Sequence, residues 1–436
     1  MLDQMAVFAV MLFSLAILAM INIKRIDVLL VALLVILTPF SVATFMPRAI
    51  LGVTGINVFN IVWLLNFVVV FFGILATKRR IDYFAYFSWP LILFCIAYTL
   101  CVLWAIIDIE SYPHEGNQAV TTKSLLIEDL AKPAQLLLAG WMVYIFCRYG
   151  NCKQLIETSI LVAAIGWGLM IVLYSSSYWG DIYEARDSVT DSTGLHSNSM
   201  AALSVYFLAF SMALRPEGKL MVCLRYLAIG FSLLGIVFTF SRIAYLTTVV
   251  IFLFLFCRLG YKEKLATMII GAAIVITFSV QIIERLNYRM DTGNLNQVSA
   301  GRIEKLWLPL MAEVEKSPLV GSGRYTILKS DAYKYKTWGT LNIDSPHSAY
   351  IELLIDMGVI GLILLMYMLY FFYESGRRSG SGLQYLVVAM LCLGLTGHSF
   401  YPYVANYLIW IVYGISVASL NKVAETNQFA IKHRLA

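Results

Sequence analysis

Apolar residues run along most of this chain in long stretches, separated by short polar connections. A helix needs roughly 17–25 apolar residues to cross about 30 Å of hydrocarbon, and many of these stretches have that length. In lipid, a spanning segment must satisfy its backbone polar groups internally, so such stretches form helices. The predicted spans are 5–22, 26–46, 54–76, 85–107, 125–147, 155–175, 195–214, 220–240, 243–258, 265–283, 348–373, 383–399 and 404–420.

This pattern predicts an all-α polytopic membrane protein, a bundle of about 12 (12–13) transmembrane helices forming a single domain over 1–436. Composition agrees, because 60% of the residues are hydrophobic, 13% are charged and the mean hydropathy is +0.78. Soluble domains usually have roughly 45–50% apolar and about 25% charged residues. The seven cysteines form no CxxC pair, so neither a disulfide framework nor a zinc site is indicated.

Basic residues recur in the short connections, which explains the net charge of +6 without invoking nucleic acid. All these connections lie an even number of predicted crossings apart and therefore share one side. The positive-inside rule makes that side the cytoplasm and places the C-terminus there. The connections contain Lys24-Arg25, Lys78-Arg79-Arg80, Arg148 with Lys153, Arg215 with Lys219, Arg258 with Lys262 and Lys264, Arg377-Arg378, and the Lys422/Lys432/Arg434 tail.

The N-terminal end is the open point of this topology. The chain begins Met1-Leu2-Asp3-Gln4, without the basic start of a signal peptide, so the first run is interpreted as a retained span. Thirteen spans place the N-terminus outside, whereas twelve place both ends inside. The 5–46 hairpin decides between the two arrangements.

The segment 284–347 is predicted to be a large loop within the single domain, on the side opposite the basic connections. Inside it, Ile303, Leu306, Leu310 and Val314 recur at helical spacing with charged residues on the other faces. That pattern predicts an amphipathic helix lying on the bundle or at the interface. Pro309 is expected to bend this helix, and Ser317-Pro318 is expected to end it. The following Gly321-Ser322-Gly323-Arg324 is expected to form a turn.

Arginines on the outer side are not explained by topology. Arg242 lies at the corner between two apolar runs, Arg302 follows Gly301 at the start of the loop helix, and Arg324 follows the Gly-Ser-Gly turn. A guanidinium presents a fixed fork of donors to phosphate oxygens, so these residues can form an anion clamp. The alternative is a side chain that extends to the interface and pairs with a lipid headgroup.

Three histidines, His196, His347 and His398, lie at the outer ends of predicted spans. A neutral histidine there can accept a proton from a hydroxyl, or it can simply be a hydrogen-bonded packing residue. His347 is the strongest candidate because it directly follows the large loop, and Asp344 could orient its ring. No HxxxH or HxxE pair and no aspartate-rich pair is present, so the chemistry is expected to be metal-free.

Three separated motifs between residues 190 and 420 resemble the family of O-antigen ligases and O-antigen polymerases. His347-Ser348, nine residues, and then Gly358-Val359-Ile360-Gly361 are similar to the ligase pattern His-[Asn/Ser/Gln]-x9-Gly-x-x-Gly. The ligase pattern often continues with Thr-Thr, where this chain has Leu362-Ile363. The other two motifs are Ser241-Arg242 and the Gly301-Arg302…Trp307…Pro318-Leu319-Val320-Gly321-Ser322-Gly323 stretch.

The resemblance implies a twelve-span bundle with short helices in a large periplasmic loop. It also implies a glycosyltransferase of the bacterial inner membrane that needs no cofactor or metal. The donor would be undecaprenyl diphosphate-linked glycan, and the acceptor would be a sugar hydroxyl of lipid A–core. Membrane lipid would surround the bundle. By this resemblance Arg242 and Arg302 would bind the diphosphate and His347 would act at the acceptor hydroxyl. Arg324 and Arg186 are added to the diphosphate site from their positions alone.

Attack opposite the leaving diphosphate predicts inversion at the anomeric carbon. Two alternatives stay open at this point. A polymerase of the same family would lengthen undecaprenyl-linked glycan, although one large outer loop, rather than two, favours a ligase. A lipid-linked glycan transporter without covalent chemistry would favour charged groups near span midpoints, whereas those here lie mainly at span ends.

Overall fold

The structure is a computed structural model of the whole chain. The residues it describes are 26–41, 49–50, 53–54, 57–76, 82, 84–112, 120–150, 152–175, 184, 190, 197–256, 260–280, 282–283, 302–330, 345–397 and 406–435. The predicted span 5–22 lies outside these residues, as do Arg186, His196 and His398.

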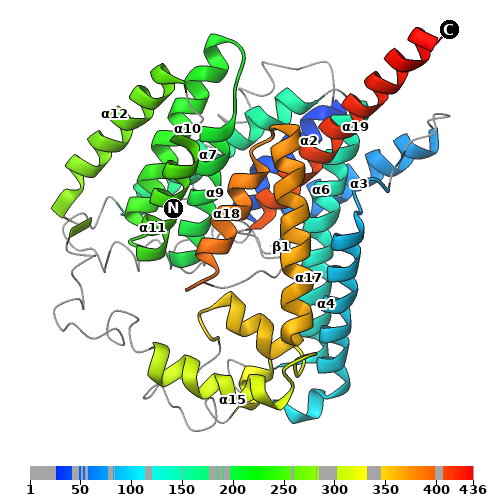
Figure 1. Cartoon of the computed structure of the whole chain (residues 1–436), viewed down its shortest axis with the longest axis vertical. Helices are drawn as coiled ribbons and strands as arrows, with labels where there is room; N and C mark the ends of the chain where they lie inside the picture. The colour runs from blue at the N-terminus through cyan, green and yellow to red at the C-terminus, as the bar shows by residue number, and fades with distance from the viewer. Residues whose placement is uncertain are drawn as a thin grey trace.

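Every other predicted span overlaps a described helix, so the hydropathy pattern located the helices correctly (Figure 1). The only strands among the described residues are the antiparallel pair β1 (Ala49–Ile50) and β2 (Val53–Thr54). The first helices are α2 (Ile26–Leu37), η1 (Thr38–Phe40), α3 (Val58–Ala76), α4 (Trp89–Ile107), η2 (Ile109–Ser111), α5 (Thr122–Ser124), η3 (Leu125–Ala131), α6 (Lys132–Tyr149) and α7 (Lys153–Ser175). The remaining helices are α9 (Ser197–Ala213), α10 (Lys219–Phe238), α11 (Arg242–Phe256), α12 (Tyr261–Thr277), η5 (Ile303–Trp307), α15 (Leu308–Lys316), η6 (Thr326–Lys329), α17 (Ala349–Ser379), α18 (Leu383–Leu393) and α19 (Tyr407–Leu435).

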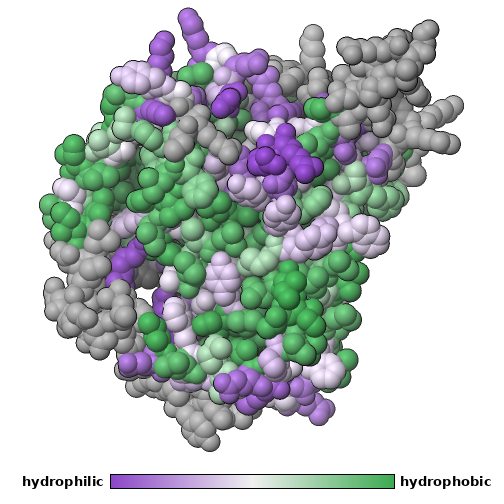
Figure 2. All heavy atoms as spheres, viewed as in Figure 1, coloured by the Kyte–Doolittle hydropathy of each residue, from purple (hydrophilic) through white to green (hydrophobic). Residues whose placement is uncertain are grey.

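Five described helical segments are long and apolar enough to cross a membrane: 89–107, 122–149, 153–175, 219–238 and 349–379. Shorter apolar helices accompany them, including α9, α11 and α18. Figure 2 shows a hydrophobic band between two hydrophilic ends, the distribution expected for a bundle surrounded by lipid. Side chains such as Phe72, Leu100 and Leu253 are more than half exposed, consistent with contact with acyl chains.

The centre of the bundle depends on glycines that allow helices to approach closely. α6 packs along α19, and a Cβ on Gly140 would lie 2.6 Å from the Trp410 carbonyl oxygen. α7 packs along α10, and a Cβ on Gly168 would lie 2.1 Å from the carbonyl oxygen of Phe231. Lipid provides no hydrophobic driving force for helix association, so small residues at such crossings allow close packing of the backbones instead.

The two ends of the bundle carry different features. In Figure 1 the α9–α10 connection, the start of α12, the end of α17 and the C-terminal end of α19 all lie at the upper end. These are places where the sequence gathers lysine and arginine. α15 lies at the opposite, lower end. These four described segments thus lie at the end of the bundle opposite α15.

α17 is not one straight span. Gly358 has φ 64° and ψ −165°, so the helix breaks there (Figure 1). Residues 349–357 form a first section, and the section after the break runs upright through the bundle. The prediction of a single span over 348–373 therefore missed a bend, which divides the part that carries His347 at its start from the part that crosses the bundle.

Candidate active site

The loop segment 302–330 is held firmly against the bundle. Leu306 and Leu310 are fully buried and Val314 nearly so, which confirms the predicted amphipathic helix over η5 and α15. α15 ends at Lys316, as Ser317-Pro318 predicted. The Trp307 indole N–H donates to the Pro346 carbonyl oxygen over 2.9 Å. This bond ties the loop helix to the residue before His347.

The backbone of residues 318–323 forms hydrogen bonds with α17 at the break. The N–H groups of Val359 and Ile360 donate to the carbonyls of Pro318 and Leu319, at 2.9 and 3.0 Å. A Cβ on Gly358 would lie 2.4 Å from the Leu319 carbonyl carbon, so the close approach and the positive φ both require glycine there. Gly321 meets the same two requirements, since its φ is 71° and a Cβ would lie 2.4 Å from the backbone of Asp356. The two glycine-rich motifs thus form one clasp between loop and span, defined here as residues 318–323 with 355–360.

Arg302 begins this loop segment, and not all of its N–H donors have hydrogen-bond partners among the described residues. Its Nη1 donates to the Thr396 carbonyl oxygen over 3.3 Å, and its buried Nε has no hydrogen-bond partner among the described residues. Burial, and then the positive charge of Arg242, lowers the pKa of Arg302 from its ordinary value. Two arginines from distant parts of the sequence therefore lie close enough for their charges to repel. Such a pair is stabilised by an anion between or beside the two guanidinium groups.

Arg242 is the first residue of α11 and is half-buried. The corner before it is built by Phe240, whose φ is 50°, and by Ser241, whose hydroxyl donates to Asn198 Oδ1 over 3.0 Å. The hydrogen bond anchors the corner to α9. A helix N-terminus carries partial positive charge, so the start of α11 adds to the attraction that Arg242 exerts on an anion.

His347 lies at the start of α17 in a strained backbone conformation with φ 48°. The backbone N–H of His347 donates to the Ser345 hydroxyl over 3.2 Å. The backbone N–H of Ala349, the first residue of α17, donates to the Gly394 carbonyl oxygen over 2.9 Å. A non-glycine residue with positive φ costs free energy and persists only where the surroundings fix it. Here Trp307 on one side and the end of α18 on the other hold the histidine backbone.

These contacts bring the three sequence-predicted residues to one end of the bundle. Arg302 interacts electrostatically with Arg242 and hydrogen-bonds Thr396, just beyond α18. Gly394, in the same turn, receives the bond from Ala349, two residues after His347. The start of α11, the end of α18 and the start of α17 therefore converge beside the loop helix. Arg302 thus lies near Arg242 and beside the turn that also contacts the start of α17, directly after His347.

Arg324 has a different environment. It is 9% exposed, and its guanidinium donates to Asp129, Glu352 and Asp356 at 2.9, 2.6 and 2.9 Å. Burial alone would lower the pKa of Arg324, but these carboxylates and the Tyr325 hydroxyl raise it well above its usual range. The charge of Arg324 is already matched by these carboxylates. Its position therefore supports a structural role, in which it holds the loop to η3 and α17, better than a role in diphosphate binding.

The carboxylates of this network were not singled out from the sequence, although a signal existed. Asp129, Glu352 and Asp356 lie within or at the edge of apolar runs, where an ionisable side chain is costly unless it is paired. Asn198, which anchors the Ser241-Arg242 corner, gave no comparable signal. Arg186, His196 and His398 lie outside the described residues, and so does Asp344.

Within the described part of the chain, no group of three or more His, Cys, Asp or Glu side chains is arranged to hold a metal ion. Three carboxylates do gather around Arg324, but the guanidinium already supplies their positive partner. Whether the reaction needs a metal is not decided by this arrangement, and metal-independent chemistry stays a prediction.

Residues 227–366 match the family model described as O-antigen ligase. The matched region begins in α10 and ends in α17, and it contains Arg242, Arg302 and His347 together with both sides of the clasp. No curated protein matches the chain significantly.

Proposed function

The family match supports assigning this chain to the O-antigen ligase family, and we propose that it transfers O-antigen polysaccharide from undecaprenyl diphosphate to a sugar hydroxyl of lipid A–core. The family and the apolar helices indicate a membrane protein that acts on lipid-linked glycan. The single observation that carries the proposal is the juxtaposition of Arg302, with its unpartnered Nε, and Arg242.

The leaving group explains why two arginines are needed. When the bond between the anomeric carbon and the diphosphate oxygen breaks, its electron pair stays on that oxygen and the negative charge there grows. Preorganised cationic donors stabilise this charge more in the transition state than in the bound substrate, and such electrostatic stabilisation is often the largest catalytic contribution. Arg242 and Arg302 repel each other, so a diphosphate relieves that repulsion when it binds.

His347 is proposed as the general base. The acceptor hydroxyl oxygen attacks the anomeric carbon on the face opposite the diphosphate, and its proton passes to the imidazole. The new bond is then a glycosidic bond with inverted configuration, and the released product is the lipid diphosphate. A positioned base typically contributes about 10²–10⁴-fold to such a step. The contacts of Trp307 with Pro346 and of Ala349 with Gly394 fix the backbone that carries this histidine.

The location follows from the same proposal. The basic connections at the upper end of Figure 1 are assigned to the cytoplasm, so the site at the lower end opens to the periplasm. The bacterial inner membrane is then the compartment, with the C-terminus cytoplasmic. The segment 284–347 is the periplasmic loop that brings Arg302 to the bundle.

The test is reconstitution of the purified full chain with undecaprenyl diphosphate-linked glycan and lipid A–core, in the presence of a chelator. Glycosylated lipid A–core is the expected product, and the His347→Ala variant should form it at least about 100-fold more slowly. A product consisting only of longer undecaprenyl-linked chains would show a polymerase instead. Absence of any glycosidic bond, under conditions where the donor binds, would contradict the enzyme assignment.

A further inference from the structure

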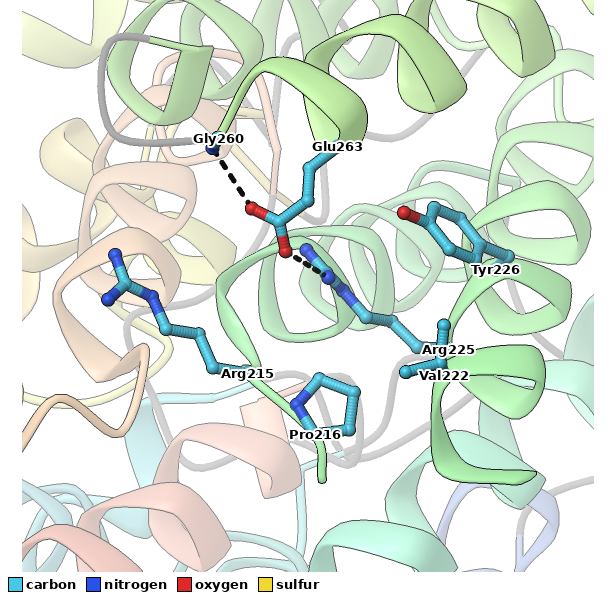
Figure 3. Close-up of a pocket in the computed structure, with 7 residues that line it drawn as sticks. All are labelled: Arg215, Pro216, Val222, Arg225, Tyr226, Gly260 and Glu263. Carbon is cyan, nitrogen blue, oxygen red and sulfur yellow. Dashed lines mark hydrogen bonds and ion pairs between the residues drawn. The ribbon is translucent and has the colours of Figure 1, made fainter. Parts of the chain in front are cut away.

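A second charged site lies at the opposite end of the molecule from Arg242 and Arg302. It is a cavity of about 600 Å³ between the α9–α10 connection, α10 and the start of α12 (Figure 3). Figure 3 shows Arg215 on one side of the cavity and Arg225 on the other, with the carboxylate of Glu263 between them. The cavity is lined by Arg215, Pro216, Val222, Arg225, Tyr226, Gly260 and Glu263.

One of the two arginines holds the cavity wall together. Arg225 is 3% exposed; its Nε and Nη2 donate to the carbonyls of Ser211 and Met212, at 2.9 Å each, and so cap the end of α9. Its Nη1 donates to Glu263 over 2.6 Å, which fastens α12 to α10. The N–H of Gly260 donates to the other oxygen of Glu263 over 3.1 Å. This part of the cavity is preorganised before any ligand binds.

Charge balance in the cavity leaves one positive charge without a counterpart. Burial would raise the pKa of Glu263, but the Arg225 hydrogen bond, the Gly260 N–H and the charges of Arg225 and Arg215 lower it. Glu263 is therefore ionised at neutral pH and offsets Arg225. The guanidinium of Arg215 makes no hydrogen bond or ion pair with any described residue, and it is exposed at the cavity mouth. A phosphate group at this mouth would meet an available fork of donors.

The surroundings indicate that such a phosphate belongs to a lipid. Leu220 on α10 is 59% exposed, and Ile269 on α12 is 59% exposed, so both helices that line the cavity carry exposed apolar side chains. Tyr261, at the start of α12, is 81% exposed, as is typical of aromatic residues at a membrane interface. Lys219 and Lys262, at the starts of α10 and α12, add positive charge nearby. A soluble phosphate ester would use the cavity but leave these apolar faces unused.

We propose that this cavity binds the headgroup of an anionic membrane phospholipid, with the phosphodiester on Arg215 and the acyl chains along α10 and α12. Basic pockets between membrane helices at the cytoplasmic surface suit anionic headgroups, because both the surface potential and the local charge attract them. The lipid would strengthen the attachment of α12, which the Arg225–Glu263 ion pair begins. The site is separate from the glycan-transfer site and rests on that proposal only for its cytoplasmic location.

Native mass spectrometry of the purified full chain with phosphatidylglycerol or phosphatidylcholine tests the site. The wild type is expected to retain phosphatidylglycerol in preference to phosphatidylcholine. Arg215→Gln should weaken phosphatidylglycerol binding about fivefold, the effect expected for one basic residue near a membrane surface. Arg378→Gln is the matched control, since Arg378 is an exposed basic residue at the same end but outside the cavity. It should leave binding unchanged.

Three results would overturn the proposal. Equal loss of binding in Arg215→Gln and Arg378→Gln, or equal retention of the two lipids by the wild type, would mean that the cavity is not a specific site. Soluble glycerophosphoglycerol distinguishes the source of the phosphate, and it is expected to compete only weakly. If it binds as tightly as phosphatidylglycerol, the cavity takes a soluble phosphate ester and the lipid assignment is wrong.

Discussion

Arg302 and Arg324 belong to the same loop segment, yet they have opposite electrostatic environments. Arg324 is surrounded by three carboxylates, from η3 and from the first section of α17. Arg302 instead lies near a second arginine and has a buried Nε without a partner among the described residues. Removing a buried cation whose countercharges are in place destabilises the fold, whereas a buried cation without them is suited to bind an external anion. The counter-charge, not the position along the chain, distinguishes a structural arginine from a binding one.

The largest effect is expected when Arg324 is removed. Arg324→Met leaves Asp129, Glu352 and Asp356 without their positive partner, and breaking a buried ion pair in this way costs about 3–5 kcal/mol. Unfolding in mixed SDS micelles should show this loss of stability, and the folded fraction should bind donor lipid normally. Wild-type stability together with lost donor binding would reverse the roles assigned to Arg324 and Arg302.

The next effect concerns catalysis. Arg302→Gln is expected to lower the turnover of glycan transfer about 10²–10³-fold, the usual loss when one preorganised donor to a developing anion is removed. Stability should fall little, because the variant relieves repulsion from Arg242. Arg242→Lys should also lose most activity, since an ammonium cannot replace the planar fork. Rates near those of the wild type in either variant would contradict the diphosphate clamp.

A smaller effect tests the clasp between the loop segment and α17. Gly358→Ala forces a Cβ to within 2.4 Å of the Leu319 carbonyl carbon at a residue with positive φ. A residue held in such a conformation costs about 1–3 kcal/mol, and the loop must shift as well. Stability and turnover should therefore fall together. Gly73→Ala is the matched control, because a Cβ there meets no atom within 4 Å. Equal behaviour of the two variants would remove the clasp from the account.

The smallest effect is expected at the edge of the Arg324 network. Lys329 donates to Asp108 over 2.6 Å, and Asp108 is about half exposed. The hydrogen bonds from Lys329 and then Ser111 lower the pKa of Asp108, so the pair stabilises the fold above the unfolded pKa of about 3.9. That contribution is lost as the pH falls through the lower, folded pKa. Lys329→Met should cost less than about 1 kcal/mol at neutral pH and flatten this acid dependence. A loss as large as that of Arg324→Met would be inconsistent with a peripheral pair.

The helices were predictable from the sequence because lipid imposes one local requirement, an apolar stretch with internal hydrogen bonds. The bend at Gly358 was not, since it depends on the backbone of 318–323, which lies about forty residues earlier and enters from outside the helix. The contacts of Arg324 with carboxylates were missed for the same reason. Its carboxylate partners come from η3 and α17, and no local pattern shows that they face it. An anion clamp of outer arginines was predicted from the sequence, and the family resemblance assigned Arg242 and Arg302 to the diphosphate.

Binding of undecaprenyl diphosphate to the purified full chain tests the central claim most directly. The dissociation constant should rise about tenfold or more in Arg302→Gln and in Arg242→Gln, because each removes a charge-assisted hydrogen bond donor. In the double variant, binding should be weakest, and Lys329→Met should bind like the wild type. Equal affinity in the wild type, both single variants and the double variant would contradict the claim that these two arginines form the diphosphate site.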